Sequence, residues 1–226
     1  MVIWGIDIQI TKSSRKTVSI YIERDGTVAA LVPEQLTDEQ IMEVIKTKEY
    51  QIHRHLAQWI QLNEAKVERE YVSGQSFMYL GRNYRLRLVD EKLGEVKLKN
   101  GYFLLSKQEK MKAKELFVEF YKAKLKEKIS PIIERYKGQL GVTPQELKIM
   151  ELQHRWASCT IKGNVNFHWK CAMAPIDVLN YIVVHELAHI IHPNHSPEFW
   201  NTVDKVLANY DSQIKWLRLN GAGMDL

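Results

Sequence analysis

The residues best suited to chemistry lie in one stretch of the sequence, VVHELAHIIHPNHSPEFW, residues 183–200. It holds four of the eight histidines of the chain and contains His185-Glu186-x-x-His189. Residues four apart on an α-helix differ by about 40° around the axis and about 6 Å along it, so both imidazoles can meet at one ion. Neutral imidazole nitrogens bind zinc at about 2.0–2.1 Å. The pattern predicts one zinc ion per chain, held by His185 and His189, with Glu186 as the catalytic base that takes a proton from metal-bound water.

A catalytic zinc site usually has three protein ligands and one open position. If the helix continued, His192 would lie about 10.5 Å beyond His185, too far for one ion to bind both. Pro193 disfavours helix at the residue before it, so the chain should turn there and bring His195 back to the metal. We therefore expect His195 as the third ligand, with Glu198 or another residue as the alternative.

These residues predict a metal-dependent hydrolase, most simply an endopeptidase that cleaves a peptide or protein substrate. The developing oxyanion needs a hydrogen-bond donor in addition to zinc. The sequence leaves four candidates for contact with the substrate or the oxyanion, namely His168, His192, Arg155 and Tyr210.

Two helices should position the histidines. Apolar residues flank the motif, which predicts a helix over 176–191. A second helix is predicted over 197–217, because Ser196 suits the N-cap and Pro197 suits the first helical position. The task of this second helix is to hold His195 in place. Upstream, the pattern of residues 155–171 predicts a hairpin that turns at Lys162-Gly163-Asn164.

The first half of the chain has mainly β character. Hairpin signals occur at Asp25-Gly26, Gly81-Arg82-Asn83 and Asn100-Gly101. A capping box at Thr37 and Gln40 predicts one long helix from there to about residue 66. Residues 107–140 are predicted to form one or two helices broken near Pro131.

The predicted fold class is α+β. Residues 1–106 form a β-rich N-terminal region with one long helix. Residues 107–226 form a compact catalytic domain with a small antiparallel sheet and the active-site helix. No internal repeat is evident in the sequence.

At this point the sequence resembles the YgjP-like metallopeptidase family, also called domain of unknown function 45, which is related to the SprT-like zinc peptidases. The resemblance rests on Arg155-Trp156-Ala157-Ser158-Cys159, on Asn166-x-x-Trp169, and on HELAH followed by NHSPEFW. It extends weakly towards the N-terminus and covers nearly the whole chain. The family implies a zincin-like catalytic domain with three histidine ligands, His185, His189 and His195, and with Glu186 as base. It usually has glycine where this chain has Ala157.

Composition limits the setting of the protein. No run of about 18 apolar residues occurs, so no membrane span is expected. The first residues do not have the features of a signal peptide. Two cysteines are too few for a disulfide framework. Together these observations predict a cytoplasmic protein, and the oligomeric state stays open.

The net charge of +5 suggests a second class of partner. Residues Lys107–Lys137 contain ten Lys or Arg and five acids, an excess equal to that of the whole chain. A basic segment of this kind can bind nucleic acid, or it can be a solvated helix face with Glu–Lys pairs. The alternative function is therefore a nucleic-acid-associated metal-dependent hydrolase, or a peptidase recruited to nucleic acid by this helix. Glu186 argues against a nucleic-acid enzyme of the H-x3-H-x5-H type, which lacks that glutamate.

Overall fold

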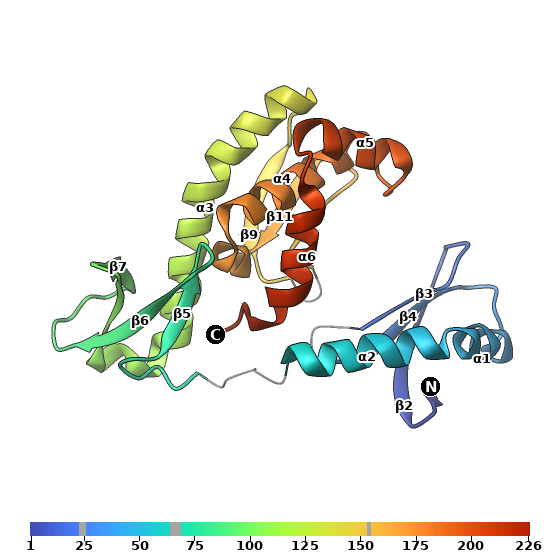
Figure 1. Cartoon of the computed structure of the whole chain (residues 1–226), viewed down its shortest axis with the longest axis horizontal. Helices are drawn as coiled ribbons and strands as arrows, with labels where there is room; N and C mark the ends of the chain where they lie inside the picture. Colours follow the sequence, from blue (N-terminus) through green and yellow to red (C-terminus); the bar gives the residue numbers. More distant parts are fainter. Residues whose placement is uncertain (23–25, 64–68, 153–154) are drawn as a thin grey trace. The chain divides into compact units, whose positions relative to one another are not determined.

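The computed structural model describes residues 1–22, 26–63, 69–152 and 155–226. The chain divides into two units, Met1–Lys66 and Val67–Leu226. The fold is α+β, as the sequence predicts, with small sheets and helices in both units (Figure 1). In the described ranges, no helix combines the length and apolar character needed to cross a membrane.

The first unit is a four-stranded sheet with two helices. Its strands are β1 (Val2–Ile3), β2 (Ile6–Ser13), β3 (Ser19–Ile22) and β4 (Val28–Pro33), in the spatial order β1-β2-β4-β3. The predicted turn at Asp25-Gly26 falls partly outside the described residues, but the strands on either side of it pair antiparallel. The sheet shares one apolar core with the helices, which includes Ile8, Val32 and Ile45.

The predicted long helix is two helices, α1 (Asp38–Thr47) and α2 (Glu49–Asn63). The capping box at the start of α1 is present, because the Thr37 and Gln40 side chains each accept the other's backbone N–H. Lys48 interrupts the helix with a non-helical ψ of 7°. The hydrophobic spacing continues across this residue, which explains why the sequence pattern alone indicated one helix.

The second unit begins with another four-stranded sheet. Its strands are β5 (Ser76–Tyr79), β6 (Arg82–Val89), β7 (Lys97–Lys99) and β8 (Tyr102–Ser106), in the order β5-β6-β8-β7. The predicted turn at Asn100-Gly101 joins β7 to β8, and both residues have the positive φ that a tight hairpin turn requires. The other turn lies at Leu80-Gly81, one residue before its predicted position. Phe77 and Phe103 of this sheet pack on Phe117 of the following helix.

The two four-stranded sheets have the same topology and register, which corrects the expectation that the chain has no repeat. In each sheet the second strand pairs antiparallel with the first and parallel with the fourth, and the third strand pairs antiparallel with the fourth. The pair Ile3↔Ile6 around the Trp4-Gly5 turn corresponds to Tyr79↔Arg82 around the Leu80-Gly81 turn. Both turns have positive φ at both residues, with values of 52° and 77° in the first and 47° and 75° in the second.

The basic segment forms a 3-10 turn, η1 (Lys107–Lys112), and then a single helix, α3 (Ala113–Leu140), so the predicted break at Pro131 does not occur. Proline inside a helix costs about 3 kcal/mol because a hydrogen bond is lost. Each fully buried Leu, Ile or Phe side chain contributes about 1.5–3 kcal/mol. Buried residues on both sides of Pro131, such as Leu125 and Ile133, therefore outweigh the penalty.

A second, smaller sheet lies next to α3. It contains β9 (Glu146–Met150), β10 (Ala157–Cys159) and β11 (Asn164–His168), in the order β10-β11-β9. The predicted hairpin is present as β10 and β11, but β9 joins it in parallel, so this sheet is mixed and not antiparallel. The 3-10 helix η2 (Trp169–Met173) then leads to α4 (Ile176–Ile191).

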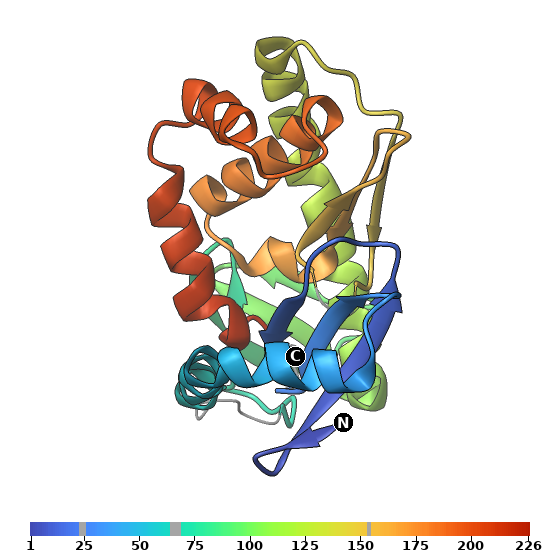
Figure 2. The same ribbon diagram turned by 90° about the vertical axis from the view of Figure 1, so that its right-hand side faces the viewer.

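Three helices complete the second unit. The predicted helix at 176–191 matches α4, whereas the predicted helix at 197–217 is two helices, α5 (Pro197–Val206) and α6 (Tyr210–Asn220). A third 3-10 turn, η3 (Gly221–Gly223), follows. Figure 2 shows α4 between the three-stranded sheet and α6, an arrangement that places the H-E-x-x-H helix against the edge strand β10.

The boundary between the units differs from the division predicted at residues 106 and 107. Strands β5–β8 share a core with α3 and α4, whose members include Phe103, Phe117 and Leu187. Residues 69–106 therefore pack with the helices that follow them, and the first unit keeps a core of its own.

The Leu80-Gly81 turn connects this sheet to the segment that precedes α4. The backbone N–H groups of Leu80 and Gly81 donate to the carbonyl oxygens of Ala172 and Met173, at 2.9 and 2.8 Å. A Cβ atom on Gly81 would lie 2.6 Å from Cγ of Pro175. The turn thus fixes the position where α4 starts, and only glycine allows this approach.

We expect Gly81→Ala to destabilise the second unit markedly. The positive φ costs about 1–2 kcal/mol for a residue with a Cβ atom, and the steric clash adds about 1–3 kcal/mol. Hydrogen–deuterium exchange with mass spectrometry measures the two units separately. The matched control is Gly5→Ala in the first unit, where φ is also positive but no atom lies within 4 Å. Equal losses of protection for the two variants, each in its own unit, would show that the contact with Pro175 is unimportant.

Candidate metal centre

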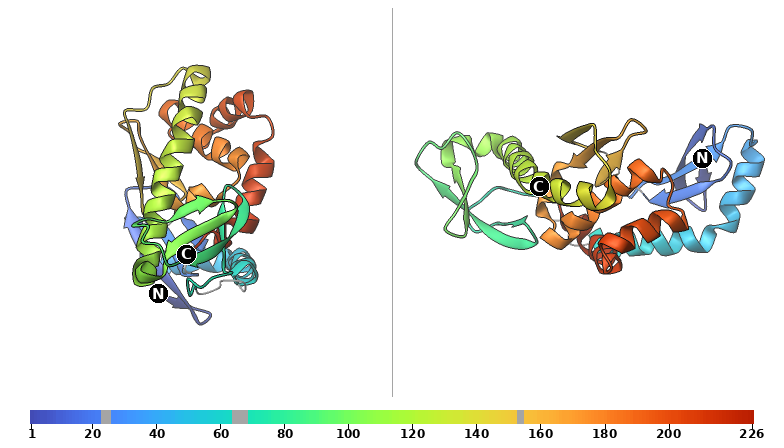
Figure 3. Two further views of the ribbon diagram at one scale, coloured as in Figure 1. Left: turned by 90° about the vertical axis from the view of Figure 1, so that its left-hand side faces the viewer. Right: turned by 90° about the horizontal axis from the view of Figure 1, so that it is seen from above.

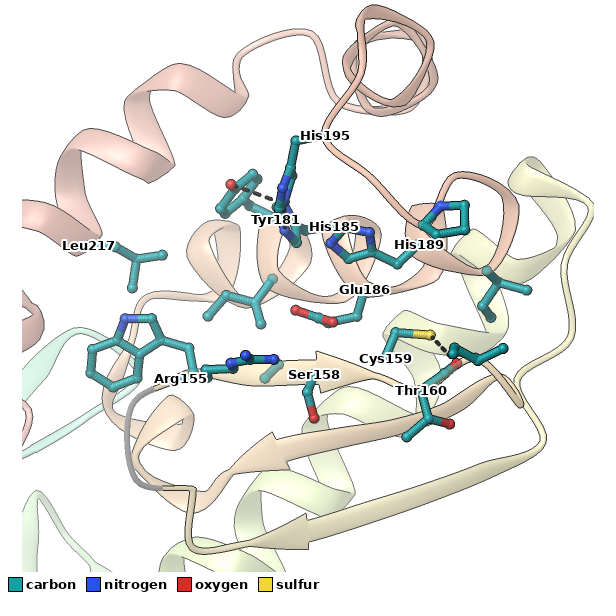
Figure 4. A pocket seen from close by; sticks show the side chains of 16 residues that line it. Arg155, Ser158, Cys159, Thr160, Tyr181, His185, Glu186, His189, His195 and Leu217 are labelled. Atoms are coloured by element: carbon teal, nitrogen blue, oxygen red, sulfur yellow. Dashed lines mark hydrogen bonds between the residues drawn. The ribbon is translucent and has the colours of Figure 1, made fainter. Parts of the chain in front are cut away.

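Helix α4 and the turn after it bring three histidines together. His185 and His189 lie one turn apart on α4, and the helix ends at Ile191, so the chain turns and returns His195 to the same face. One ligand nitrogen from each of the three rings lies within 4.8 Å of the others. The Nε2 atoms of His185 and His195 are 3.0 Å apart. Figure 4 shows the three rings on one wall of a cavity.

Neighbouring groups orient two of these rings. Nδ1 of His185 lies 3.3 Å from the hydroxyl of Tyr181, and Nδ1 of His189 lies 3.1 Å from the carbonyl oxygen of His192. An Nδ1–H donated to each oxygen leaves Nε2 with a free lone pair. Hydrogen bonds of this type commonly fix the tautomer and orientation of metal-binding histidines.

Aromatic residues of α5 pack against the cluster. The Phe199 ring lies 4.9 Å from His185, 4.6 Å from His189 and 4.8 Å from His195, measured between ring centroids. The Trp200 ring stacks on His195 at 5.7 Å. Ser196 is the N-cap residue of α5 and Pro197 its first residue, although the Ser196 hydroxyl donates to the side chain of Glu198 and does not cap the helix.

The donor set fits a metal ion. Burial, together with the other two imidazoles, lowers the pKa of His185 to about 3. Burial and the neighbouring His189 also hold the pKa of His195 below its ordinary value. Both shifts favour the neutral form of His185 and His195, the form that metal ligands require. Nitrogens that share a tetrahedral zinc ion at about 2.0–2.1 Å lie roughly 3.3 Å apart, a spacing close to that of the facing nitrogens here.

Glu186 lies on the same helix but points to the strand β10. Its side chain is 6% exposed, and the backbone N–H of Cys159 donates to its carboxylate. Burial raises the pKa of the Glu186 carboxyl to about 7, while the positive charge of Arg155 and the Cys159 hydrogen bond oppose this rise. A carboxyl group in this range can exchange a proton near neutral pH.

The cluster and Glu186 line a cavity of about 590 Å³. Its walls come from β10 and the residues around it, from α4, from the turn after α4, and from Leu217 of α6. In Figure 4 Glu186 lies between the histidines and the side chains of Arg155, Ser158 and Cys159. The cavity therefore offers three metal-binding nitrogens and one buried carboxylate to a single bound molecule.

Of the four candidates for contact with substrate or oxyanion, Arg155 lines this cavity. His168 is fully buried, with Nε2 3.1 Å from Glu151 and Nδ1 accepting the Lys170 N–H. The ring of His192 is turned to the Thr202 hydroxyl on α5, 3.1 Å away. The ring of Tyr210 stacks on Trp200. Among the residues that the structure describes, His168, His192 and Tyr210 do not line this cavity.

Two features of the site were missing from the sequence prediction. Tyr181 precedes His185 by four residues, so the helical period could have identified it as a partner of that ring. The backbone N–H of Cys159 reaches Glu186 only because β10 packs on α4. No local sequence signal reports a contact of that kind.

Comparisons with known proteins relate the chain to one family. A comparison with protein families matches residues 16–220 to the YgjP-like metallopeptidase domain. A search of curated proteins found no match. Among solved structures, the chain is similar to the metallopeptidase zymogen of Pyrococcus abyssi abylysin, with 25% sequence identity and a TM-score of 0.37. That similarity covers 41% of this chain and 92% of the other.

Proposed function

The chain belongs to the YgjP-like metallopeptidase family, and on this premise we propose that it is a zinc-dependent endopeptidase. In this proposal His185, His189 and His195 hold one zinc ion per chain, and Glu186 is the general base. The observation that carries the proposal is the convergence of three imidazoles and one buried carboxylate on a single cavity. Catalytic zinc sites use three protein ligands and keep one position open, which agrees with this set.

In this proposal, Glu186 moves the proton that amide hydrolysis requires. When bound, zinc would supply a Lewis acid that polarises the substrate carbonyl and makes water more acidic. The Glu186 carboxylate accepts a proton from the attacking water and delivers it to the nitrogen of the leaving amine. The water oxygen bonds to the carbonyl carbon and the C–N bond breaks. The second proton of the water also passes to the leaving nitrogen, so the products are one carboxylate and one ammonium group. The hydrogen bond from Cys159 holds the carboxylate in position during both transfers.

Arg155 is the proposed contact for negative charge on the substrate. Its cationic side chain lines the cavity on the side of Glu186. Positive groups aimed at the charge that develops in the transition state lower the barrier most where water is excluded.

An extended peptide is the proposed substrate, because β10 is the free edge of its sheet. The carbonyl oxygen of Trp156 accepts from His168 N–H, and Thr160 N–H donates to Asn164 of β11. Backbone groups alternate in direction along an antiparallel strand, so those of Ala157 and Cys159 point away from β11, towards the cavity. Because the Cys159 N–H donates to Glu186, a substrate strand would add to this edge through the backbone groups of Ala157 and the carbonyl oxygen of Cys159. Pairing along this edge does not require a free N- or C-terminus of the substrate, which supports endopeptidase activity.

The proposed setting is the cytoplasm. Cys159 and Cys171 are both free thiols, and proteins of reducing compartments rarely contain disulfides.

The experiment that tests the function is cleavage of an unfolded protein and a mixed peptide library. We expect zinc-loaded protein to generate new termini that mass spectrometry detects. Chelator-treated protein should generate none, and added zinc should restore cleavage. Undiminished cleavage after verified removal of all metal would contradict the proposal, as would zinc-loaded protein that cleaves nothing.

A further inference from the structure

The outer face of the sheet β5-β6-β8-β7 is cationic. Leu86, Phe103 and Leu105 point into the core, so the residues that alternate with them point outwards. The register of the strands forms two outer rows across β6, β8 and β7, which are Arg85–Tyr102–Lys99 and Arg87–Leu104–Lys97. The left view of Figure 3 shows this sheet beside the N-terminal end of α3. Strands β5–β8 contain no acidic residue.

The four cations of this face, Arg85, Arg87, Lys97 and Lys99, are exposed. Within the described residues, Lys97 has an ion-pair partner, Glu95 at 3.5 Å, and the other three have none within 4 Å. The Arg87 guanidinium lies 4.1 Å from the centroid of the Tyr102 ring. The two rows therefore present four cations around the Tyr102 ring, and three of them have no acidic partner among the described residues.

The sheet of the first unit serves as an internal control for this charge. By register, Gln9 and Thr11 occupy the positions of Arg85 and Arg87. In the same way, Ser19 and Tyr21 occupy the positions of Lys97 and Lys99. The same strand arrangement thus forms with four uncharged residues at these positions. Like charges that gather on one face of a sheet repel each other, so the fold itself gives no reason for the cations.

The basic helix, which the sequence leaves open as a nucleic-acid site or as a solvated face with Glu–Lys pairs, differs from this sheet face. On α3, Lys122 pairs with Glu119, Lys124 with Glu127 and Lys137 with Glu134, at 2.7–2.8 Å. These pairs neutralise part of the charge that the sequence pattern emphasised. In the second unit, cations without an acidic partner therefore define a clearer surface on the sheet than on α3.

We propose that the outer face of β5–β8 binds single-stranded nucleic acid. Arg and Lys bind phosphates, and the half-buried Tyr102 ring with the Arg87 guanidinium over it offers a base a stacking surface. An acidic peptide matches the charge but leaves the ring without a partner. Neighbouring cations on one strand are about 6.7 Å apart, and cations on β6 and β7, the two strands that flank β8, are about 9.6 Å apart. A single extended nucleic-acid backbone can therefore contact several of them.

The test uses the whole zinc-loaded chain and fluorescent 20-nucleotide oligo-dT and oligo-U. Anisotropy at increasing salt should show binding with a slope of about −2.8 in log K against log salt, for four phosphate contacts at about −0.7 each. The variant carries the first unit's residues at the matched positions, as Arg85→Gln, Arg87→Thr, Lys97→Ser and Lys99→Tyr. We expect it to lose most of the affinity and most of the slope for both oligonucleotides. Tyr102→Ala should weaken binding about 5–150-fold.

The matched control removes four positive charges from α3, as Lys122→Gln, Lys124→Gln, Lys128→Gln and Lys137→Gln. It should bind nearly as wild type does. Equal losses in both fourfold variants, or a loss in the helix variant alone, would overturn the proposal. So would competition by poly-glutamate as effective as competition by unlabelled oligonucleotide. Circular dichroism confirms that each variant folds. If the fourfold sheet variant does not fold, the double variant Arg85→Gln, Arg87→Thr decides, and undiminished affinity in it would overturn the proposal.

Discussion

Glu186→Gln should bind zinc as tightly as the wild type and cleave peptides about 10²–10⁴-fold more slowly, because general base catalysis contributes about that factor. Glutamine has nearly the same shape and can still interact with the Cys159 N–H, but its amide does not accept the proton. The three histidines are untouched, so the metal site should stay intact. Steady-state cleavage of a peptide identified from the library, together with zinc content by mass spectrometry, measures both effects.

The matched control for this substitution is Glu198→Gln. Glu198 is an exposed glutamate at the start of α5, close in sequence to His195, and its carboxylate accepts a hydrogen bond from Ser196. It is absent from the described cavity wall. We expect wild-type kcat/KM for this variant. Turnover that survives in Glu186→Gln would remove Glu186 as the base, and loss of zinc in that variant would give it a structural role at the metal.

The sequence could predict the histidine cluster because its determinants are local. The proximity of His185 and His189 follows from the helical period, and the return of His195 follows from Pro193, which favours a turn before it. His168 shows where local reasoning fails. The sequence leaves His168 as a candidate for contact with the substrate. In the structure its ring is buried and hydrogen-bonds to Glu151, which follows β9. Only tertiary packing determines such a contact.

The repeated sheet was hidden for a related reason. The two copies share strand register and turn conformation, whereas most matched side chains differ, as Gln9 and Arg85 do. A four-stranded sheet requires alternation and turn chemistry but tolerates many residues on its outer face. The single helix through Pro131 is a further case in which buried contacts override a local signal. In each case the information lies in pairing or packing between distant segments.

His195→Ala should abolish stoichiometric zinc binding. It removes one of three nitrogens that lie within 4.8 Å of one another, and two protein ligands rarely hold catalytic zinc. Removing only a hydrogen-bond partner of a ligand typically costs 10–100-fold in metal affinity, so the loss of the ligand itself should exceed 100-fold. Competition with a chromogenic zinc chelator measures this affinity.

Glu198→Ala decides between the two candidates for the third ligand. The two residues are three apart in sequence, and only His195 belongs to the described cluster. With free zinc at 1,000 times the dissociation constant, bound metal stabilises a folded protein by about 4.1 kcal/mol. Wild type and Glu198→Ala should both show this stabilisation in thermal unfolding, and His195→Ala should lack it at the same zinc concentration. The reverse outcome, with zinc retained in His195→Ala and lost in Glu198→Ala, would assign the third position to the carboxylate. The turn at Pro193 would then position α5, which carries Glu198, and the packing of Trp200 on His195 would only stabilise the fold.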